Sequence, residues 1–485
     1  MDNVRTRFAP SPTGFMHVGN LRTALYAWLL ARSSRGKFVL RIEDTDRARL
    51  VRDAVAVIYA TLKRAGLDHD EGPDAGGEYG PYVQSERKSI YAEYAKKLVA
   101  SGAAYYCFCD KQEEHEPAEG EAAPVSQGCP GNCRDCSPAE AERRVSSGEP
   151  YVIRQKIDRA GTSTFNDLVF GEITIENKVL DDQILLKRDG MPTYNFANVV
   201  DDHLMRITHV VRGSEYLSST PKYNLLYRAF GWEIPKYVHL PLIMGRDAEG
   251  NVSKLSKRHG SVSFENLISE GYLSEAIVNY IALLGWSPKS DREIFSLEEL
   301  VAAFNLSGLN KSPAVFDYDK LRWMNAEHIK MMPPEKFAEV SFPFSGLAGS
   351  PVERNYPSIA ALLQARTELL TEIPEKVAFF KELPEYDAAL FCLQKSKATP
   401  ETARAALTAL LPKFAELPEW NRDAVAAALK TYAEEIQVKI GQPMWAARIA
   451  VSGQAVTPGG PGEIMEILGR EESLRRMRAA LAKLA

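Results

Sequence analysis

Two separate segments of the sequence combine residue types that suit the binding of polyphosphate. The first is the loop Pro10–Gly14 with His17 and Gly19 behind it, where a short apolar run passes into a helical pattern. A helix N-terminus offers free N–H groups and the positive end of the helix dipole, and both attract phosphate. His17 can donate to a phosphate oxygen there, and Gly19 has no side chain to keep a flat base from the backbone. Taken alone, the pattern is equally typical of an ordinary strand–turn–helix junction.

The second segment is Lys254-Leu-Ser-Lys257-Arg258, which follows an apolar strand pattern and precedes His259-Gly260. Its cations and hydroxyl can hold a polyphosphate and stabilise the negative charge that develops when diphosphate leaves. In isolation such a sequence is more often a solvated basic loop. The presence of both segments in one chain makes a polyphosphate site the better interpretation. We predict that His17, Lys254 and Lys257 are its catalytic side chains.

The cysteines form the third group of residues that can do chemistry. Their spacing is Cys107-x-Cys109, then 19 residues, then Cys129-x₃-Cys133-x₂-Cys136, with Cys392 far away. Thiolates paired at the two ends of a loop suit tetrahedral zinc, whereas a secreted protein would spread its cysteines as a disulfide framework. We expect one structural Zn²⁺ per chain, and unliganded reduced cysteines are the alternative. The expected ligands are Cys107, Cys109, Cys129 and Cys133, with Cys136 as the alternative fourth ligand.

The elements that position the first segment follow an α/β order. The periodicity predicts strands over Val4–Phe8 and Phe38–Ile42, and helices over Val18–Ala31, Ala54–Ala65 and Glu86–Ala100. Alternating strands and helices indicate a parallel sheet, and ligands bind such sheets at the carboxyl ends of the strands. His17 and Glu43 fall at these ends.

A change of composition interrupts this order. The segment 107–150 is rich in Glu, Ala, Pro and Cys, and we expect a mobile loop over 111–127. Several short strands are predicted over 151–187. The α/β order then resumes with a strand over Ile207–Arg212, a helix over Thr220–Phe230 and a strand over Val238–Ile243, and from Phe264 onward the periodicity is almost entirely helical. The pattern predicts a nucleotide-binding fold that is split by an inserted module.

Composition indicates a globular protein but does not show which molecules it binds. The chain has 485 residues, 45% of them apolar and 25% charged, which is ordinary for a globular protein. No run of about 20 apolar residues is present, and Met1–Phe8 lacks a signal-peptide pattern. We therefore expect a cytoplasmic protein with no membrane partner. Its net charge of −5 gives no sign of nucleic acid, so a nucleic-acid binder of this composition must gather Lys and Arg on one face.

The two phosphate segments together resemble the signatures of class I aminoacyl-tRNA synthetases. Those signatures, usually written HIGH and KMSKS, stand here as His17-Val-Gly-Asn20 and Lys254-Leu-Ser-Lys-Arg258. Further segments resemble specifically the bacterial-type glutamyl-tRNA synthetases, in family order over the first 325 residues. They are Arg7–Gly14, Arg41–Asp46, Asp70–Asp74, Pro192–Asn198, Val199–His203 and Leu321–Asn325.

The resemblance implies a role for individual residues. Arg7, Ala9, Ser11, Glu43, Tyr194, Asn198 and Arg212 match residues that hold glutamate, with Glu43 receiving the ammonium group. His17, Gly19, Glu215, Ile243, Lys254 and Lys257 match ATP contacts. Arg366 and Arg448 stand where family arginines contact anticodon bases, and a solvated helix face is an equally good interpretation of both. A dicarboxylate amino acid does need cations for its carboxylates and an anion for its ammonium group, which agrees with this set.

The resemblance also implies the fold and the reaction. We expect a Rossmann-like α/β class I catalytic domain, split by a zinc-binding module and followed by an all-α anticodon-binding region. Glutamate would attack ATP, which enters with Mg²⁺, to form glutamyl-adenylate and diphosphate. The 2′-hydroxyl at the 3′ end of tRNA(Glu) would then take the glutamyl group and release AMP, with activation waiting for bound tRNA. Some family members carry zinc in the acceptor-stem module. Whether tRNA(Gln) is also charged stays open.

These expectations divide the chain into five parts and predict a monomer. Residues 1–100 and 190–243 are the two halves of the catalytic domain, with the acceptor-stem module and zinc site over 101–189 between them. Residues 244–328 form a stem-contact domain with the KLSKR segment, and 329–485 are the helical anticodon-binding region, in two subdomains.

Two other classes of protein share part of this pattern. A nucleotidyltransferase can have an H-x-G-x loop and activate a small acid without RNA, but it usually lacks a long helical C-terminal half. A non-catalytic RNA-binding paralogue is expected to lose His17 or Lys257, and both are present. Within the family, the extra helical region excludes a truncated glutamyl-queuosine enzyme.

Overall fold

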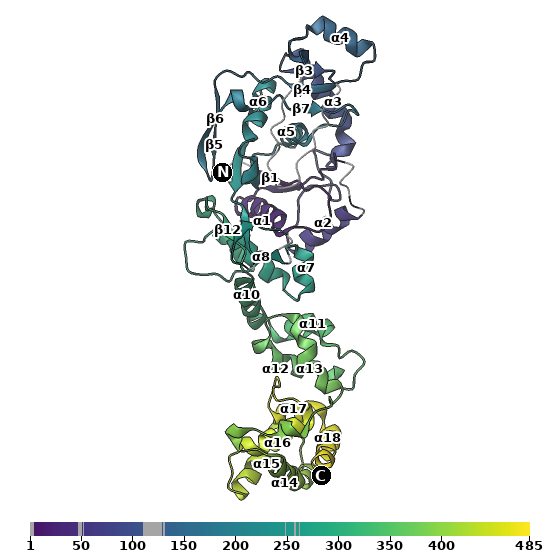
Figure 1. Ribbon diagram of the computed structural model, residues 1–485, viewed down its shortest axis with the longest axis vertical. Coiled ribbons are helices and arrows are strands. Elements are labelled where there is room, and N and C mark those ends of the chain that lie inside the picture. Colours follow the sequence, from purple (N-terminus) through teal and green to yellow (C-terminus); the bar gives the residue numbers. More distant parts are fainter. Residues whose placement is uncertain are drawn as a thin grey trace. The chain divides into compact units, whose positions relative to one another are not determined.

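A computed structural model describes residues 4–46, 51, 53–109, 129, 131–247, 249–256, 259–260 and 262–485. The chain folds into two compact units (Figure 1). One comprises Met1–Ser269 with Ser274–Tyr318, and the other comprises Glu270–Leu273 with Asp319–Ala485. The predicted mobile loop 111–127 lies outside the described residues.

The first unit begins with a parallel β–α–β arrangement. Strands β1 (Arg5–Phe8) and β2 (Lys37–Leu40) pair in parallel, and helix α1 (Val18–Ser33) connects them. Leu21, Leu25 and Leu29 are fully buried on α1, because residues spaced by about four lie on one helical face. The unit continues with α2 (Ala54–Arg64).

Four strands from the middle of the chain form the second part of the nucleotide-binding fold. Strands β8 (His209–Gly213) and β9 (Lys236–Leu240) are parallel and are connected by α6 (Thr220–Phe230). The hairpin of β5 (Thr162–Asp167) and β6 (Gly171–Glu176) extends this sheet, whose strand order is β6-β5-β9-β8. The N–H of Thr208 donates to the carbonyl of Arg5 (2.9 Å), so β8 begins beside β1. The predicted Rossmann-like core, split by an insertion, is confirmed.

The insertion contains an antiparallel sheet of β3 (Ala104–Cys107), β4 (Val152–Gln155) and β7 (Ile184–Leu186). Helix α3 (Lys88–Ala100) precedes it, α4 (Pro138–Ser146) lies within it and α5 (Tyr194–Leu204) follows it (Figure 1). The short strands predicted over 151–187 are therefore present. Helix α3 begins two residues later than predicted, because Gln84–Arg87 forms a 3₁₀ turn.

The end of the first unit carries the second phosphate segment. Strands β10 (Ile243–Arg246) and β11 (Val252–Lys254) form a hairpin, and β12 (Ala314–Val315) pairs with β10 in parallel. Helices α7 (Phe264–Ser269), α8 (Ser274–Leu283) and α9 (Leu297–Ala303) lie in between in the sequence. The short strand β12 is an exception to the helical prediction from Phe264 onward.

One predicted strand proves to be two. Within the apolar run Val238–Ile243, strand β9 ends at Leu240 and strand β10 begins at Ile243. Pro241 lies between them, and a proline has no N–H to give to a sheet. The strand predicted from Ile207 similarly begins at His209.

The described part of the second unit is helical, as predicted. Its helices are α10 (Tyr318–Met331), α11 (Pro334–Ser345), α12 (Tyr356–Leu363), α13 (Ile373–Lys381), α14 (Pro400–Ala415), α15 (Arg422–Glu435), α16 (Gly441–Ser452), α17 (Pro461–Leu468) and α18 (Arg470–Lys483). Leu407, Leu410 and Phe414 are fully buried on one face of α14. Among the described residues, no helix is long and apolar enough to cross a membrane.

Candidate active site and metal centre

A buried network of opposite charges lies where β1, β2 and α5 meet. Arg41 has no exposed surface and donates to Glu43 (2.9 Å) and to Asp202 (2.7 Å). Arg87 donates to Asp201 (2.7 Å). With Arg7, the network contains three arginines and three carboxylates, so its formal charges cancel. Buried ions need this pairing, because an unpaired one would lose its hydration without compensation.

Arg7 and Glu43, which were assigned to glutamate binding, both belong to this network. Arg7 is 4% exposed, and its Nε donates to Asp202 at 3.1 Å. Glu43 is also 4% exposed, and the hydrogen bonds of its side chain within the described part of the chain all end on Oε1. Burial raises the pKa of Glu43 to about 7, against the opposing charges of Arg41 and Arg7. Its second oxygen, Oε2, takes no hydrogen bond from the part of the chain that the structure describes.

Arg212 comes to the same region from β8. Its Nε donates to Nε2 of His239 (3.0 Å), and its Nη2 donates to Oγ1 of Thr220 (2.6 Å). Three tyrosine rings surround the guanidinium group at 4.7–5.3 Å from their centroids: those of Tyr216, Tyr223 and Tyr237. A guanidinium held on one edge can present the other edge to a carboxylate as a fork.

Tyr194 and Asn198 lie one turn apart on α5. The side chain of Asn198 is buried and donates to the carbonyl of Tyr194 (2.9 Å). The Tyr194 ring packs near that of Tyr216, with 5.7 Å between centroids. Burial raises the pKa of Tyr194, with a contribution from the negative charge of Glu43, and the charges of Arg212 and Arg7 oppose the shift. The structure thus brings Arg7, Glu43, Tyr194 and Arg212 into one electrostatic neighbourhood, and Ala9 and Ser11 follow β1 in the sequence.

His17 forms the N-cap of α1. Its Nδ1 accepts a hydrogen bond from the N–H of Gly19 (3.0 Å), so a neutral ring carries its proton on Nε2. Burial and the charge of Lys254 lower the pKa of His17 to about 4, which keeps the ring neutral. A side chain at position 19 would meet this ring, with a Cβ only 3.2 Å from Nδ1. The helix N-terminus therefore presents an Nε2–H donor and an open approach.

The remaining predicted ATP contacts lie on neighbouring elements of the first unit. Lys254 is exposed at the end of β11, and Ile243 is buried at the start of β10. Glu215 lies in the 3₁₀ turn after β8, with Oε2 buried and without a partner among the described residues. Lys257 and Arg258 lie outside the described residues, so their assignment stays a prediction.

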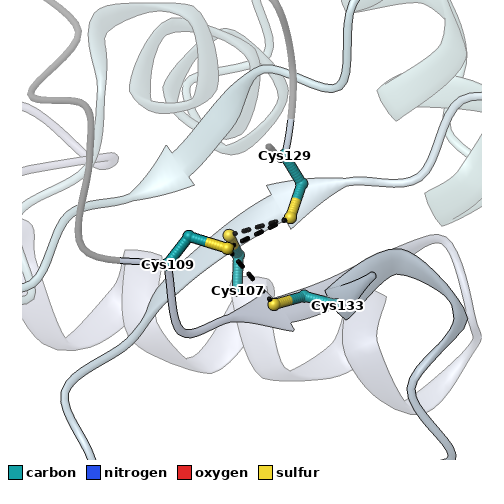
Figure 2. A group of neighbouring side chains, drawn as sticks. All are labelled: Cys107, Cys109, Cys129 and Cys133. Atoms are coloured by element: carbon teal, nitrogen blue, oxygen red, sulfur yellow. Dashed lines mark hydrogen bonds between the residues drawn. The ribbon is translucent and has the colours of Figure 1, made fainter. Parts of the chain in front are cut away.

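Four cysteines converge in the inserted module (Figure 2). The sulfur atoms of Cys107, Cys109, Cys129 and Cys133 all lie within 4.8 Å of one another. Three of the pairs, Cys107–Cys129, Cys109–Cys129 and Cys109–Cys133, are separated by 3.4–3.6 Å. This is close to the ~3.8 Å spacing that Zn–S bonds of ~2.3 Å give in a tetrahedron. The set could hold a metal ion. It contains Cys133 rather than Cys136, as predicted.

The second unit contains a pocket of about 470 Å³ that Arg366 and Arg448 both line. Arg366 donates to the carbonyl of Pro458 (3.0 Å). Arg448 has a buried Nε without a partner among the described residues, and burial together with the charge of Arg366 lowers its pKa. The structure thus places both arginines in one hollow, and their contact with anticodon bases stays a prediction.

Sequence reasoning missed the residues that hold the predicted ones in place. Asp202, Asp167 and His239 received no role, although each is buried and bonded to Arg7 or to the surroundings of Arg212. The available signal was a charged or polar residue inside an apolar run, as at Asp201–Asp202 after Val199–Val200. Such residues are seldom fully buried unless they are paired.

Comparison with known protein families covers both units. Residues 3–323 match the family described as tRNA synthetases class I (E and Q), catalytic domain, and residues 334–481 match the family described as anticodon binding domain. The glutamate–tRNA ligase of Clostridium novyi (strain NT) is 53% identical over 484 residues, which cover 99% of this chain and 98% of that protein. That of Clostridium botulinum (strain Hall) is 52% identical, covering 100% of this chain and 99% of that protein.

Two solved structures have the same fold over the full chain. A glutamate–tRNA ligase from Elizabethkingia meningosepticum, in complex with its amino acid, has a TM-score of 0.88 at 33% identity and covers 100% of both chains. The glutamate–tRNA synthetase of Elizabethkingia anophelis has a TM-score of 0.86 at 32% identity and covers 99% of this chain and 100% of that chain. The match extends over both units and the candidate site. The chain therefore belongs to the glutamate–tRNA ligases, a branch of the class I aminoacyl-tRNA synthetases.

Proposed function

We propose that this protein attaches L-glutamate to tRNA(Glu) at the expense of ATP, through a glutamyl-adenylate, and releases AMP and diphosphate. The observation that carries the proposal is the gathering of the buried side chains of Arg7, Glu43 and Arg212 around Tyr194. A dicarboxylate amino acid needs this set of charges. A neutral side chain would leave one buried guanidinium without its partner.

The residues have distinct roles in this proposal. Arg212, with Arg7 and Tyr194 nearby, holds the side-chain carboxylate, and Glu43 receives the ammonium group. Asn198, Ala9 and Ser11 line the rest of the pocket. The reacting carboxylate is then free to attack the α-phosphorus of ATP. Because its position is already fixed, the reaction avoids most of the entropy cost of a bimolecular encounter.

The two phosphate segments supply the electrostatic part of the catalysis. The Nε2–H of His17 donates to a phosphate oxygen at the N-terminus of α1, where the helix dipole adds to the attraction. Lys254 and Lys257 stabilise the charge that develops on the departing diphosphate. Gly19, Glu215 and Ile243 receive the nucleoside. Mg²⁺ enters with ATP as part of the substrate.

The other parts of the chain hold the tRNA. Residues 1–100 and 190–243, with the β5–β6 hairpin, carry the chemistry. The rest of 101–189 meets the acceptor stem, 244–328 contact the stem, and 329–485 read the anticodon with Arg366 and Arg448. Zinc held by the four cysteines stiffens the inserted module and takes no part in the reaction. The protein acts as a monomer, and its cytoplasmic location stays a prediction.

Exchange of labelled diphosphate into ATP tests the adenylate step. We expect exchange with L-glutamate when tRNA(Glu) is present and little exchange without it. Lys257→Ala should lower the rate about 10²- to 10³-fold, as expected for one lost transition-state donor. Equal exchange with and without tRNA would favour a nucleotidyltransferase that activates a small acid on its own.

A further inference from the structure

The three neighbouring strands β5, β9 and β8 place an acid, a histidine and an arginine in one row. In the parallel register of β8 and β9, Arg212 lies opposite His239. Asp167, the last residue of β5, lies opposite Tyr237 of β9. The side chains of Asp167 and His239 have no exposed surface, and Arg212 is 5% exposed. These three side chains are therefore shielded from water, and Arg212 is the one that belongs to the proposed glutamate site.

The hydrogen bonds along this row fix which nitrogen of His239 carries the proton. A guanidinium group can only donate, so Nε2 of His239 must accept from Nε of Arg212 (3.0 Å). The proton then lies on Nδ1, which donates to Oδ2 of Asp167 (2.7 Å). Burial and the charge of Arg212 lower the pKa of His239 to about 4, against the effect of Asp167. The ring is thus neutral and of one tautomer.

Asp167 is itself held in one orientation. Its Oδ1 accepts from the backbone N–H groups of Val169 (2.9 Å) and Phe170 (2.8 Å), and Oδ2 also accepts from the N–H of His239 (3.1 Å). Four hydrogen bonds satisfy the carboxylate and keep it ionised, since hydrogen bonds to the charged form favour it. The turn between β5 and β6 therefore sets the direction of the His239 ring.

We propose that His239, oriented by Asp167, is a positioning residue that sets the angle of the Arg212 guanidinium and thereby the preference for glutamate over glutamine. The proposal rests on the proposed function, in which Arg212 holds the side-chain carboxylate. A bidentate fork needs a fixed plane as well as a charge. With Nε and Nη2 anchored at His239 and Thr220, the free edge of the guanidinium points in one direction, and a carboxylate meets two parallel N–H groups there.

The experiment compares His239→Asn and His239→Gln in the full-length chain. The glutamine amide reaches the place of Nε2 and can accept from Arg212, whereas the asparagine amide reaches only the place of Nδ1. His209→Asn is the matched control, because His209 is a buried histidine of the same sheet whose Nδ1 contacts Thr208. The readouts are KM and kcat in tRNA-dependent diphosphate exchange, for glutamate, glutamine and ATP.

We expect His239→Asn to raise the KM for glutamate about 10- to 100-fold, as for one lost hydrogen bond to a charged group. The KM for ATP should stay within about twofold, and glutamine should be affected little. His239→Gln should recover most of the loss. In an Arg212→Lys background, which lacks Nε, the further effect of His239→Asn should be much smaller than in wild type, since coupled residues are not additive.

Other results would overturn the proposal and separate it from the assignment of Arg212. If Arg212→Lys lowers the preference for glutamate while His239→Asn leaves it unchanged, the positioning role fails and the proposed function stands. If His239→Asn weakens glutamate and ATP alike and His239→Gln gives no recovery, its role is only structural. If Arg212→Lys and Arg212→Ala keep the full preference for glutamate, the proposed role of Arg212 fails, and the positioning role fails with it.

Discussion

Glu43 is a buried carboxyl group whose two oxygens have different tasks. Oε1 takes hydrogen bonds from Arg41 and Gln84, and in the proposed function Oε2 receives the ammonium group of the substrate. Burial raises its pKa to about 7, so we expect part of the free enzyme to hold Glu43 protonated near neutral pH. The protonated form cannot attract a cation.

Binding of glutamate should therefore improve as the pH rises through about 7. The kcat/KM for glutamate in diphosphate exchange reports the free enzyme, and it should increase between pH 6 and pH 8. Glu43→Gln should show a lower kcat/KM without this increase. The same increase in the Glu43→Gln variant would mean that another group titrates.

Arg212 should decide between carboxylate and amide. Leaving a buried guanidinium unpaired costs about 3–5 kcal/mol, a discrimination of ~10²–10³ or more. Arg212→Ala should lower kcat/KM for glutamate by about that factor and change glutamine little. Arg212→Lys should recover only part, because an ammonium group cannot form the fork. Equal losses for both amino acids would show that Arg212 is not the selector.

Single residues were predictable where they belong to a local motif. His17 and Gly19 lie at the N-terminus of α1, as the loop-to-helix pattern predicts. The partners of the pocket were not predictable from spacing, because Arg7 and Asp202 are 195 positions apart and meet only when β1 packs beside β8 and α5. Periodicity carries no information about such long-range pairs.

The cysteine cluster depends on how short elements bring distant residues together. Cys107 ends β3, and Cys133 begins a 3₁₀ turn, so both are held by regular structure. The spacing predicted two halves of a metal site. It left Cys136 as an alternative fourth ligand beside the pair Cys129 and Cys133. The turn selects Cys133, which joins the cluster of four sulfurs.

Purified protein should contain about one zinc per chain by elemental analysis, and Cys107→Ser and Cys133→Ser should lose it. Cys136→Ser is the matched control and should keep the metal. Loss of zinc from Cys136→Ser but not from Cys133→Ser would reverse the choice of the fourth ligand. If zinc-free protein binds acceptor stems as well as the zinc-containing protein does, the metal has no structural role.

The pocket of α12, α16 and the loop after it should bind a base of the anticodon. Arg366→Ala and Arg448→Ala should each raise the KM for tRNA(Glu) about 10- to 100-fold, as for an arginine that contacts a base. The KM for glutamate should change little. Arg404→Ala, on an exposed position of α14, is the control. An effect no larger than that of the control would show that both arginines belong to a solvated helix face and do not contact the anticodon.

The whole molecule comprises an α/β unit, to which we assign the chemistry, and a helical unit with a pocket lined by Arg366 and Arg448. This division was visible in the sequence, because the periodicity changes from alternating strands and helices to helices alone near Phe264. The predicted ends of single strands differ from the observed ones because of backbone effects. Pro241, for example, divides one apolar run into β9 and β10. Net charge was the least informative property, since the chain is acidic overall, whereas Arg366 and Arg448 line one pocket.

Charging of purified tRNA(Glu) and tRNA(Gln), side by side, with labelled glutamate and glutamine tests the account most directly. We predict that glutamate becomes attached to tRNA(Glu) in an ATP-dependent reaction and that glutamine is attached to neither tRNA. Attachment of glutamate to tRNA(Gln) as well would show how broadly the anticodon is read and would leave the pocket chemistry intact. Attachment of glutamine, or failure to charge tRNA(Glu) with glutamate, would contradict the account.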